Sequence, residues 1–350
     1  MRHHIKIGKR SIGPEDPCFI IAEAGVNHNG DITLAKKLID VAVEAGADAV
    51  KFQTFKTENV VTPTAEKAEY QKATTGATES QYEMIKRLEL SEANFWDLSE
   101  YARVAGIIFL STPFDEESVD LLDQIGVPAF KIPSGEITNY PLLKKIAQKS
   151  KPIILSTGMA TLGEVEGALN HLKMHGAEEI VLLHCTTSYP APIASVNLRA
   201  METLRCAFRV PVGYSDHTEG ITIPIAAAAM GARAIEKHFT LDRTLPGPDH
   251  RASLEPGELA AMVKAVRDVE LARGSGVKCP TEEEEVIKRV ARKSVVAKRD
   301  IRAGDILTEG DLAIKRPGTG IEPKYFDAVV RRRAKVSIQR DQVIRWDMIE

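Results

Sequence analysis

The feature that most constrains the fold is a rhythm of short apolar runs, each followed by a segment with the periodicity of an amphipathic helix. Alternating strands and helices of this kind are typical of a parallel sheet covered by helices. Eight such units are the number that closes a (β/α)₈ barrel, which the rhythm therefore predicts. A doubly wound open sheet is the second possibility, disfavoured because no G-x-G-x-x-G follows the first run. We expect strands at 18–24, 48–53, 107–112, 129–134, 152–157, 180–186, 211–215 and 233–239, and helices at 33–46, 91–105, 116–125, 139–149, 161–175, 196–208, 219–231 and 256–272.

Two segments depart from this rhythm. The second loop, at about residues 54–90, is long and polar, which is typical of a lid or specificity element on the catalytic face of a barrel. After residue 273 the character changes to short β-rich pieces. We therefore predict a barrel over 1–275, a linker over 276–293 and a small domain over 294–350. A domain of about 60 residues buries little core, so we expect it to pack on something else, such as another subunit.

Composition narrows the class of protein. The 350 residues carry a net charge of -3, so no general affinity for nucleic acid or for an anionic membrane is expected. The four cysteines form no C-x-x-C pair and fit a reducing compartment. Residues 1–8 lack the apolar core of a signal peptide, and no apolar run is long enough to span a bilayer. We expect a soluble, cytoplasmic protein.

Polar side chains follow the predicted strands at their carboxyl ends, where a barrel of this type places its active site. Two lysines, two glutamates and two histidines on one rim are costly to bury without partners or a ligand. A structural network of ion pairs is the alternative, but it would not easily account for the hydroxyl groups on the same rim. We predict a site for an anionic substrate, with candidate residues Glu23, Lys51, Gln53, Thr112, Lys131, Ser134, Ser156, Ser215, His217, Glu236 and His238.

His217 and His238 end two consecutive apolar runs. A right-handed strand–helix–strand unit puts both histidines at neighbouring strand ends. Neutral imidazoles are good ligands for a divalent metal that keeps open positions for substrate, so the pair predicts a metal site. Two buried structural histidines are the alternative.

Two glutamates are candidates to orient water or to move protons. Glu23 stands at the end of the first run, and Glu136 follows the fourth. In the alternative interpretation, Glu136 caps the helix from 139 and Glu23 pairs with a lysine.

Ten strings spread over nearly the whole chain carry a family resemblance. They are IAEAGVNHNG (21–30), KFQTFK (51–56), STPFD (111–115), FKIPSGEITNYPLL (130–143), ILSTGM (154–159), LLHCTTSYP (182–190), GYSDHT (213–218), EKHFT (236–240), PGPDHRASL (246–254) and KRPGTGI (315–321). In this order they resemble the sialic acid synthase family, enzymes that make N-acetylneuraminate and related nonulosonic acids from phosphoenolpyruvate. The family's barrel is followed by a small antifreeze-like domain, the SAF domain, and residues 294–350 resemble it.

The resemblance implies a reaction and a cofactor. Phosphoenolpyruvate would condense with N-acetylmannosamine or a close relative to give a nine-carbon 2-keto sugar acid and phosphate, with cleavage of a C–O bond. His217 and His238 would hold a divalent ion, manganese or magnesium, that polarises the sugar's aldehyde. Glu236 would join the metal or orient one of its ligands. Glu23 and Glu136 would position water and transfer protons.

The resemblance also implies substrate contacts. Those to phosphoenolpyruvate are Lys51, Thr112, Lys131, Ser134, Ser156 and Ser215, and those that line the sugar or the pocket are Gln53, Phe114, Tyr189 and Asp249. Arg316 matches an arginine that the SAF domain presents to the barrel of the partner subunit, near the N-acetyl group of the sugar. A domain-swapped homodimer with composite sites follows from this match.

One departure from the family bears on the sugar. Where one bacterial subgroup has an asparagine in the second loop, this chain reads KATTGATESQYEM, with threonine and glycine at that place. The loop is more similar to synthases of legionaminate or of other surface-polysaccharide nonulosonates. The substituents at C4 and C6 of the sugar therefore stay open between N-acetylmannosamine and its 4-acetamido-6-deoxy relatives.

Three other functions compete with this interpretation. A Schiff-base aldolase of the same fold would use Lys51 or Lys131 as its amine nucleophile. A synthase acting on a shorter sugar phosphate is disfavoured by the appended domain and Arg316. A carbohydrate- or ice-binding module on an inactive barrel is disfavoured by the lysines, glutamates and histidines at the strand ends.

Overall fold

The structure, a computed structural model, describes residues 4–76 and 78–350. The chain divides into two compact units, Met1–Gly274 and Ser275–Glu350. Each unit has its own cluster of buried apolar residues.

The sheet of the first unit consists of parallel strands that lie within two residues of the predicted ones. They are β3 (Phe19–Gly25), β4 (Ala49–Thr54), β5 (Ile108–Pro113), β6 (Phe130–Ile132), β7 (Ile153–Ser156), β8 (Ile180–Cys185), β9 (Val212–Asp216) and β10 (Ala234–His238). Their spatial order is β5-β4-β3-β10-β9-β8-β7-β6, which follows the chain around a circle. The two end strands, β5 and β6, contact each other, so the sheet is nearly closed. A doubly wound sheet would reverse its order at a switch point, and the predicted (β/α)₈ barrel is therefore confirmed.

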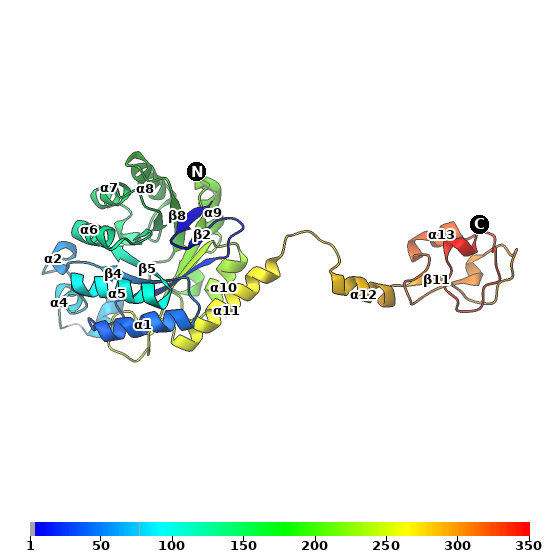
Figure 1. The fold of residues 1–350 in the computed structure, drawn as a ribbon, viewed down its shortest axis with the longest axis horizontal. Coiled ribbons are helices and arrows are strands. Elements are labelled where there is room, and N and C mark those ends of the chain that lie inside the picture. Colours follow the sequence, from blue (N-terminus) through cyan, green and yellow to red (C-terminus); the bar gives the residue numbers. More distant parts are fainter. Residues whose placement is uncertain (1–3, 77) are drawn as a thin grey trace. The chain divides into compact units, whose positions relative to one another are not determined.

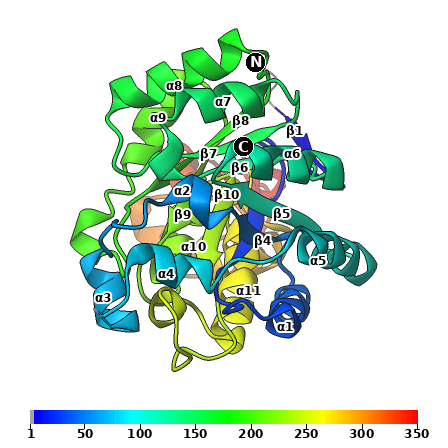
Figure 2. The same cartoon turned by 90° about the vertical axis from the view of Figure 1, so that its left-hand side faces the viewer.

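Helices surround this sheet (Figure 2). They are α1 (Ile32–Glu44), α5 (Glu92–Ala105), α6 (Glu116–Ile125), α7 (Tyr140–Ala147), α8 (Leu162–Met174), α9 (Ala200–Phe208), α10 (Thr222–Ala229) and α11 (Pro256–Arg273). Asp31, Ser91 and Thr161 cap α1, α5 and α8 by accepting hydrogen bonds from backbone amides of the first turn. The outward side chains of the strands pack against these helices and form the largest apolar core.

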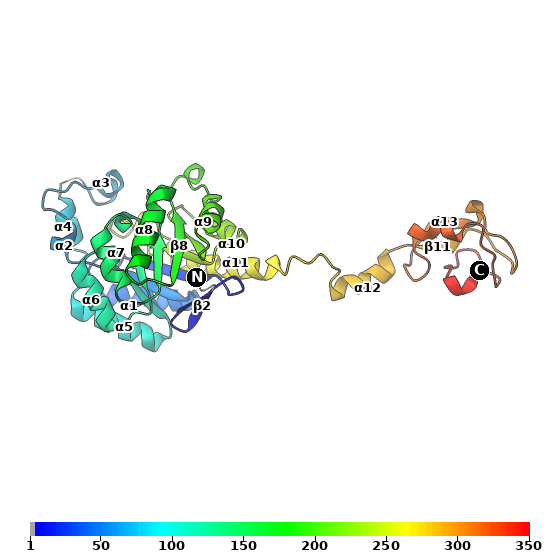
Figure 3. The same cartoon turned by 90° about the horizontal axis from the view of Figure 1, so that it is seen from above.

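The long second loop contains short helices that the sequence patterns did not indicate. They are α2 (Thr57–Val60), α3 (Glu69–Thr75) and α4 (Gln81–Lys86). Figure 3 shows all of them at one end of the barrel. A small apolar cluster of Val26, Phe55 and Leu88 lies beneath this loop, separate from the main core.

A hairpin lies toward the opposite end of the barrel from this loop (Figures 1 and 3). Its strands, β1 (Ile5–Ile7) and β2 (Arg10–Ile12), pair antiparallel. Ile5, Ile7 and Ile12 are fully buried and cluster with the inward-facing apolar residues of the barrel strands. The hairpin therefore fills the amino end of the barrel. Strands of three residues give too short a pattern to be predicted from sequence.

The second unit is a small β-rich fold preceded by a helix. It contains α12 (Glu282–Ala291), β11 (Ser294–Ala297), β12 (Leu312–Lys315) and α13 (Phe326–Val329), and β11 pairs antiparallel with β12. Val295, Leu307, Ile338 and Ile344 belong to its buried core. The predicted linker thus contains a helix, which Thr281 caps at its start.

Short 3₁₀ turns complete the elements: η1 (Ser134–Glu136), η2 (Ile193–Ser195), η3 (His250–Ala252), η4 (Glu309–Asp311), η5 (Pro323–Tyr325) and η6 (Trp346–Met348). Within the described residues, no helix has the length and apolar character needed to cross a membrane.

Candidate active site

The site arises where the inward positions of the barrel strands change from apolar to polar residues. Alternate side chains of a strand face the same side, so Glu23 is the next inward residue after Phe19 and Ile21. The same step takes β4 from Ala49 to Lys51. It recurs at Thr112, Lys131, Ser156 and Glu236, which follow Leu110, Ala129, Ile154 and Ala234. The result is a polar ring directly above an apolar layer.

This ring lines a cavity of about 460 Å³. The cavity wall contains most of the predicted site residues, namely Glu23, Lys51, Gln53, Thr112, Phe114, Lys131, Ser134, Ser156, Tyr189, Ser215, His217, Glu236, His238 and Asp249. The structure therefore brings together side chains from all around the barrel.

Two lysines and two glutamates form a buried charge network in the cavity wall. Lys51 Nζ lies 2.6 Å from Glu23 Oε2 and 3.9 Å from Glu236 Oε2, and Lys131 Nζ lies 3.5 Å from Glu236 Oε1. Burial raises the pKa of Glu23 to about 7, although Lys51 opposes the rise. Burial also disfavours ionised Glu236, but Lys131 and Lys51 outweigh it and hold the pKa of that carboxyl below its usual range. When Glu23 is protonated the network carries net positive charge, which suits an anionic ligand.

Hydroxyl groups and unpartnered polar atoms surround this network. Thr112 accepts a hydrogen bond from Lys51 (2.9 Å), which leaves its own proton available to a ligand. Ser156 Oγ, Glu236 Oε2 and His238 Nδ1 are among the buried atoms with no hydrogen-bond partner in the described part of the chain. Buried polar groups in folded proteins nearly always have a partner, so such atoms gathered in one cavity indicate a ligand site.

The two histidines lie side by side, with ring centroids 5.5 Å apart. His217 Nδ1 lies 2.8 Å from the Thr186 carbonyl oxygen. Because a carbonyl oxygen can only accept, Nδ1 carries the hydrogen and donates it, and in the neutral ring Nε2 keeps a lone pair. Burial lowers the pKa of both imidazoles, which are therefore neutral near pH 7. No cluster of three or more His, Cys, Asp or Glu side chains suited to a metal occurs among residues 4–76 and 78–350. Two neutral imidazoles, one with an unpartnered nitrogen, fit a divalent ion that takes its other ligands from water and substrate.

A buried ion pair behind the cavity ties the two histidine-bearing strand ends together. Asp216 and Lys237 are neighbours across β9 and β10, fully buried, with Nζ and Oδ2 2.6 Å apart. Lys237 also donates to the Thr218 carbonyl, and Thr218 Oγ1 donates to Asp216 (3.0 Å). Alternation along the strands turns this pair away from the cavity and His217 and His238 toward it. The sequence patterns did not single out this pair.

Aromatic and acidic groups form the outer part of the cavity. The Tyr189 ring lies 4.2 Å from the His217 ring, centroid to centroid. Gln53 Nε2 donates to Glu23 Oε1 at 3.3 Å. Burial alone raises the pKa of Asp249 to about 6.

Several cavity residues were missed by the sequence patterns. Tyr70, Gln71, Gln81 and Met84 come from the short helices of the second loop, and Cys185 ends β8. The spacing of Met84, Ile85 and Leu88 in an otherwise polar segment is the one signal that could have indicated a helix there.

Two predicted site residues do not line the cavity. Glu136 is half-buried in η1 and accepts a hydrogen bond from Asn139 Nδ2 (2.6 Å) at the start of α7. Arg316 is exposed on the second unit, where its Nε donates to the Ala291 carbonyl (3.0 Å). The roles assigned to both residues stay predictions.

Comparison with known proteins places the chain in a family. The NeuB family model matches residues 38–278, and the SAF domain model matches residues 292–350. N,N'-diacetyllegionaminic acid synthase of Campylobacter jejuni is 54% identical over 93% of this chain and 98% of its own length. Human N-acetylneuraminate-9-phosphate synthase is 38% identical over 97% of this chain and 95% of its own length. The crystal structure of N-acetylneuraminic acid synthetase from Leptospira borgpetersenii, 38% identical, superposes with a TM-score of 0.72 over 81% of this chain and 94% of that one. The resemblance seen in the sequence strings is thus confirmed, and the chain belongs to the NeuB family, with a SAF domain after its barrel.

Proposed function

We propose that this NeuB-family enzyme condenses phosphoenolpyruvate with an N-acylated mannosamine to give a nine-carbon 2-keto sugar acid and phosphate. The observation that carries the proposal is the buried ring of Lys51, Lys131 and hydroxyl groups beside two neutral histidines in one cavity. The ring offers charge and donors for a small dianionic or trianionic substrate, and the histidines offer ligands for a metal at a carbonyl.

In this proposal the strand ends bind phosphoenolpyruvate. Lys51 and Lys131 supply charge to its carboxylate and phosphate. Thr112, Ser134 and Ser156 supply hydroxyl hydrogen bonds, and Ser215 does so once its proton turns from Glu236 to the ligand. The unpartnered Ser156 Oγ supports this role, since a ligand oxygen would satisfy it.

The histidine pair fits a resident divalent ion, manganese or magnesium, held by His217 and His238. Such an ion supplies Lewis-acid polarisation of the sugar's aldehyde oxygen when bound. Glu236, which accepts a hydrogen bond from Ser215 (3.1 Å) and faces both lysines, keeps the lysine charges in place beside this centre.

The glutamates handle water and protons. C3 of phosphoenolpyruvate bonds to the aldehyde carbon, water adds at C2, and phosphate leaves with the bridging oxygen as the C–O bond breaks. Glu23, whose pKa near 7 allows it to accept or release a proton at neutral pH, positions the water and takes its proton. Glu136, which does not line the cavity in this structure, is the second proton-transfer group of the proposal.

The second unit completes the site in a homodimer, in which Arg316 of one subunit reaches the N-acyl group of the sugar in the other. We propose that this dimer acts in the cytoplasm. Arg316 is exposed and uses its Nε in the hydrogen bond to Ala291, and its guanidinium carries further N–H groups that could meet the N-acyl group.

For the sugar, the relatives favour a substrate with a second acetamido group. The Campylobacter legionaminic acid synthase is 54% identical to this chain and that of Legionella pneumophila 50%, against 38% for the human sialic acid 9-phosphate enzyme. We therefore propose the 4-acetamido-6-deoxy relative of N-acetylmannosamine as the substrate, with N-acetylmannosamine itself as the second candidate. Gln53, Phe114, Tyr189 and Asp249 line the space that would receive it.

A substrate panel tests the proposal, with phosphate release from phosphoenolpyruvate as the readout. We expect the highest kcat/KM with the 4-acetamido-6-deoxy sugar. Phosphoenolpyruvate labelled with ¹⁸O at the bridging position should transfer its label to phosphate. Retention of the label in the keto acid would mean that the P–O bond breaks and would refute the proposed C–O cleavage. Trapping of the enzyme by borohydride with pyruvate would instead favour the Schiff-base aldolase.

A further inference from the structure

The loop side of the cavity has little apolar packing to hold it in place. Tyr70 and Gln71 of α3 line the cavity. None of the described side chains of α3 belongs to a buried apolar cluster. In contrast, α4 contributes the buried Met84 and packs Ile85 on the small cluster beneath the loop. The position of α3 therefore depends on polar contacts together with the ring of Tyr70, which stacks on Tyr189.

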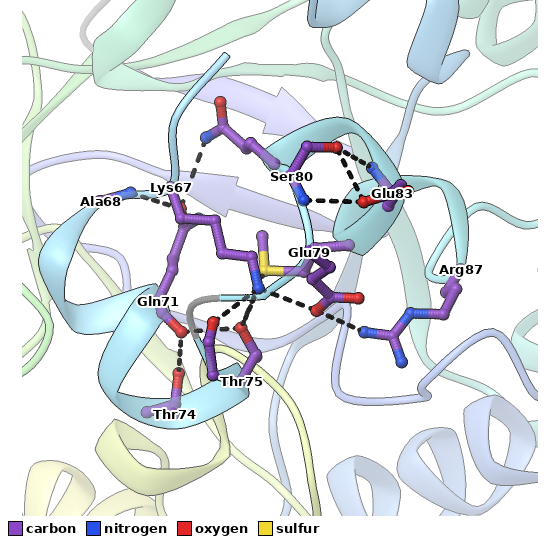
Figure 4. Close-up of polar contacts among 12 residues, drawn as sticks. Lys67, Ala68, Gln71, Thr74, Thr75, Glu79, Ser80, Glu83 and Arg87 are labelled. Carbon is purple, nitrogen blue, oxygen red and sulfur yellow. Dashed lines mark hydrogen bonds and ion pairs between the residues drawn. The ribbon is translucent and has the colours of Figure 1, made fainter. Parts of the chain in front are cut away.

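Lys67 supplies those contacts from just before α3 (Figure 4). Its ammonium donates to Thr75 Oγ1, to the Gly76 carbonyl and to Glu79 Oε1, each at 2.9 Å. An ammonium has three donors, so all of them are used. The contacts join Lys67, two residues before the start of α3, to the end of α3 and to Glu79, which precedes α4.

The contacts of Lys67 are needed because its side chain is buried. The Lys67 side chain is only 1% exposed, whereas Glu79 is 22% exposed and also pairs with Arg87 at 2.7 Å. A buried ammonium requires hydrogen-bonding partners, so the segment closes around Lys67. Replacing Lys67 by methionine removes the contacts but leaves Glu79 paired with Arg87, so no buried charge is stranded.

Stacked aromatic rings connect α3 to the active site. Tyr70 of α3 stacks on Tyr189, with centroids 5.2 Å apart and planes 29° apart. Tyr189 in turn lies against His217. The lysines assigned to phosphoenolpyruvate stand on barrel strands and are fixed independently of α3.

We propose that Lys67 is a positioning residue that holds α3 and Tyr70 against Tyr189, and so controls binding of the amino sugar but not of phosphoenolpyruvate. The identity of the two substrates rests on the proposed function; the closure of α3 by Lys67 does not.

Steady-state kinetics of Lys67→Met test the substrate part of the proposal. We expect the KM for the amino sugar to rise about tenfold, with the KM for phosphoenolpyruvate changed less than about twofold. The matched control is Lys72→Met, which removes a lysine of α3 itself that pairs with Glu69 at the surface (2.8 Å). The control should leave both constants unchanged. Equal effects of Lys67→Met on both substrates, or no effect, would overturn the proposal.

Limited proteolysis tests the closure of α3 without any turnover. Chymotrypsin cleaves after tyrosine, and Tyr70 is covered by Tyr189 in the closed segment. We expect cleavage after Tyr70 to be faster in Lys67→Met than in the wild type and in Lys72→Met. Equal rates in all three proteins would refute the role of Lys67. If the wild type turns over no amino sugar but Lys67→Met is still cleaved faster, the proposed function is refuted and the role of Lys67 stands.

Discussion

At the scale of single residues, burial sets the charge of Asp249. Burial raises the pKa of this carboxyl from its ordinary value of 3.8 to about 6. The folded state therefore binds a proton that the unfolded state has already released between these two values. The stability contribution of Asp249 is present below about pH 4 and is lost as the pH rises through 6.

We expect Asp249→Asn to remove this pH dependence. At pH 8 the variant should be more stable than the wild type by at most about 3 kcal/mol, and at pH 4 the two should be nearly equal. Urea unfolding at the two pH values measures the difference. The same variant should bind the sugar more weakly, since a neutral amide replaces an ionised acceptor. An equal stability difference at both pH values would contradict the assignment.

The histidine pair gives a second prediction at this scale. His217→Ala or His238→Ala should reduce kcat by about a thousandfold or more, because each removes one of the two protein ligands proposed for the metal. Manganese binding, followed by the electron paramagnetic resonance signal of the free ion, should weaken in parallel. The thermal unfolding midpoint of the metal-free protein serves as the control for folding. Full activity of the metal-stripped double variant would exclude a Lewis acid at this place.

At the scale of elements, the Asp216–Lys237 pair fixes the ends of β9 and β10. Lys237→Met leaves Asp216 buried without its partner and should destabilise the barrel by about 3–5 kcal/mol in urea unfolding. Asp216→Leu combined with Lys237→Met removes both charges and should recover most of that loss. Because the strand ends also carry His217 and His238, we expect manganese affinity to stay below that of the wild type in the double variant. Wild-type affinity there would show that the pair serves stability alone.

The strands and their polar ends could be predicted because each carries its own signal. Runs such as 18–24 and 48–53 are apolar over a whole strand length, and Glu23 and Lys51 stand out as charged residues at their ends. Strand order then followed from the handedness of the connections and the number of units.

The missed features carry no such signal. β1 and β2 are too short, and the helices of the second loop lack an apolar stripe of useful length. The polar sequence around Lys67 predicts a solvent-exposed side chain. In the structure that side chain is buried, with a partner 12 positions away in the chain. Asp216 and Lys237 lie 21 positions apart, and only the register of β9 with β10 brings them together.

At the scale of the whole molecule, the position of Arg316 on the second unit gives a prediction about assembly. Arg316→Ala should raise the KM for the sugar more than that for phosphoenolpyruvate. In a swapped dimer, mixing Arg316→Ala with His217→Ala subunits creates heterodimers with one intact composite site. We expect such a mixture, after dissociation and reassembly, to recover up to about a quarter of wild-type activity at limiting sugar. No gain over the separate variants would mean that each subunit uses its own arginine.

The hairpin at the amino end of the barrel limits the side from which a ligand can enter the cavity. Because Ile5, Ile7 and Ile12 close that end, the cavity opens at the carboxyl end of the strands. Lys51 and Lys131 lie on the strands, closer to the hairpin. Phe114, Asp249 and the helices of the second loop lie closer to the open end. A ligand that settles on the lysines is then covered by one that follows it. If the proposed function holds, this arrangement predicts ordered kinetics: the enol phosphate would bind before the sugar, and inorganic phosphate would leave after the keto acid.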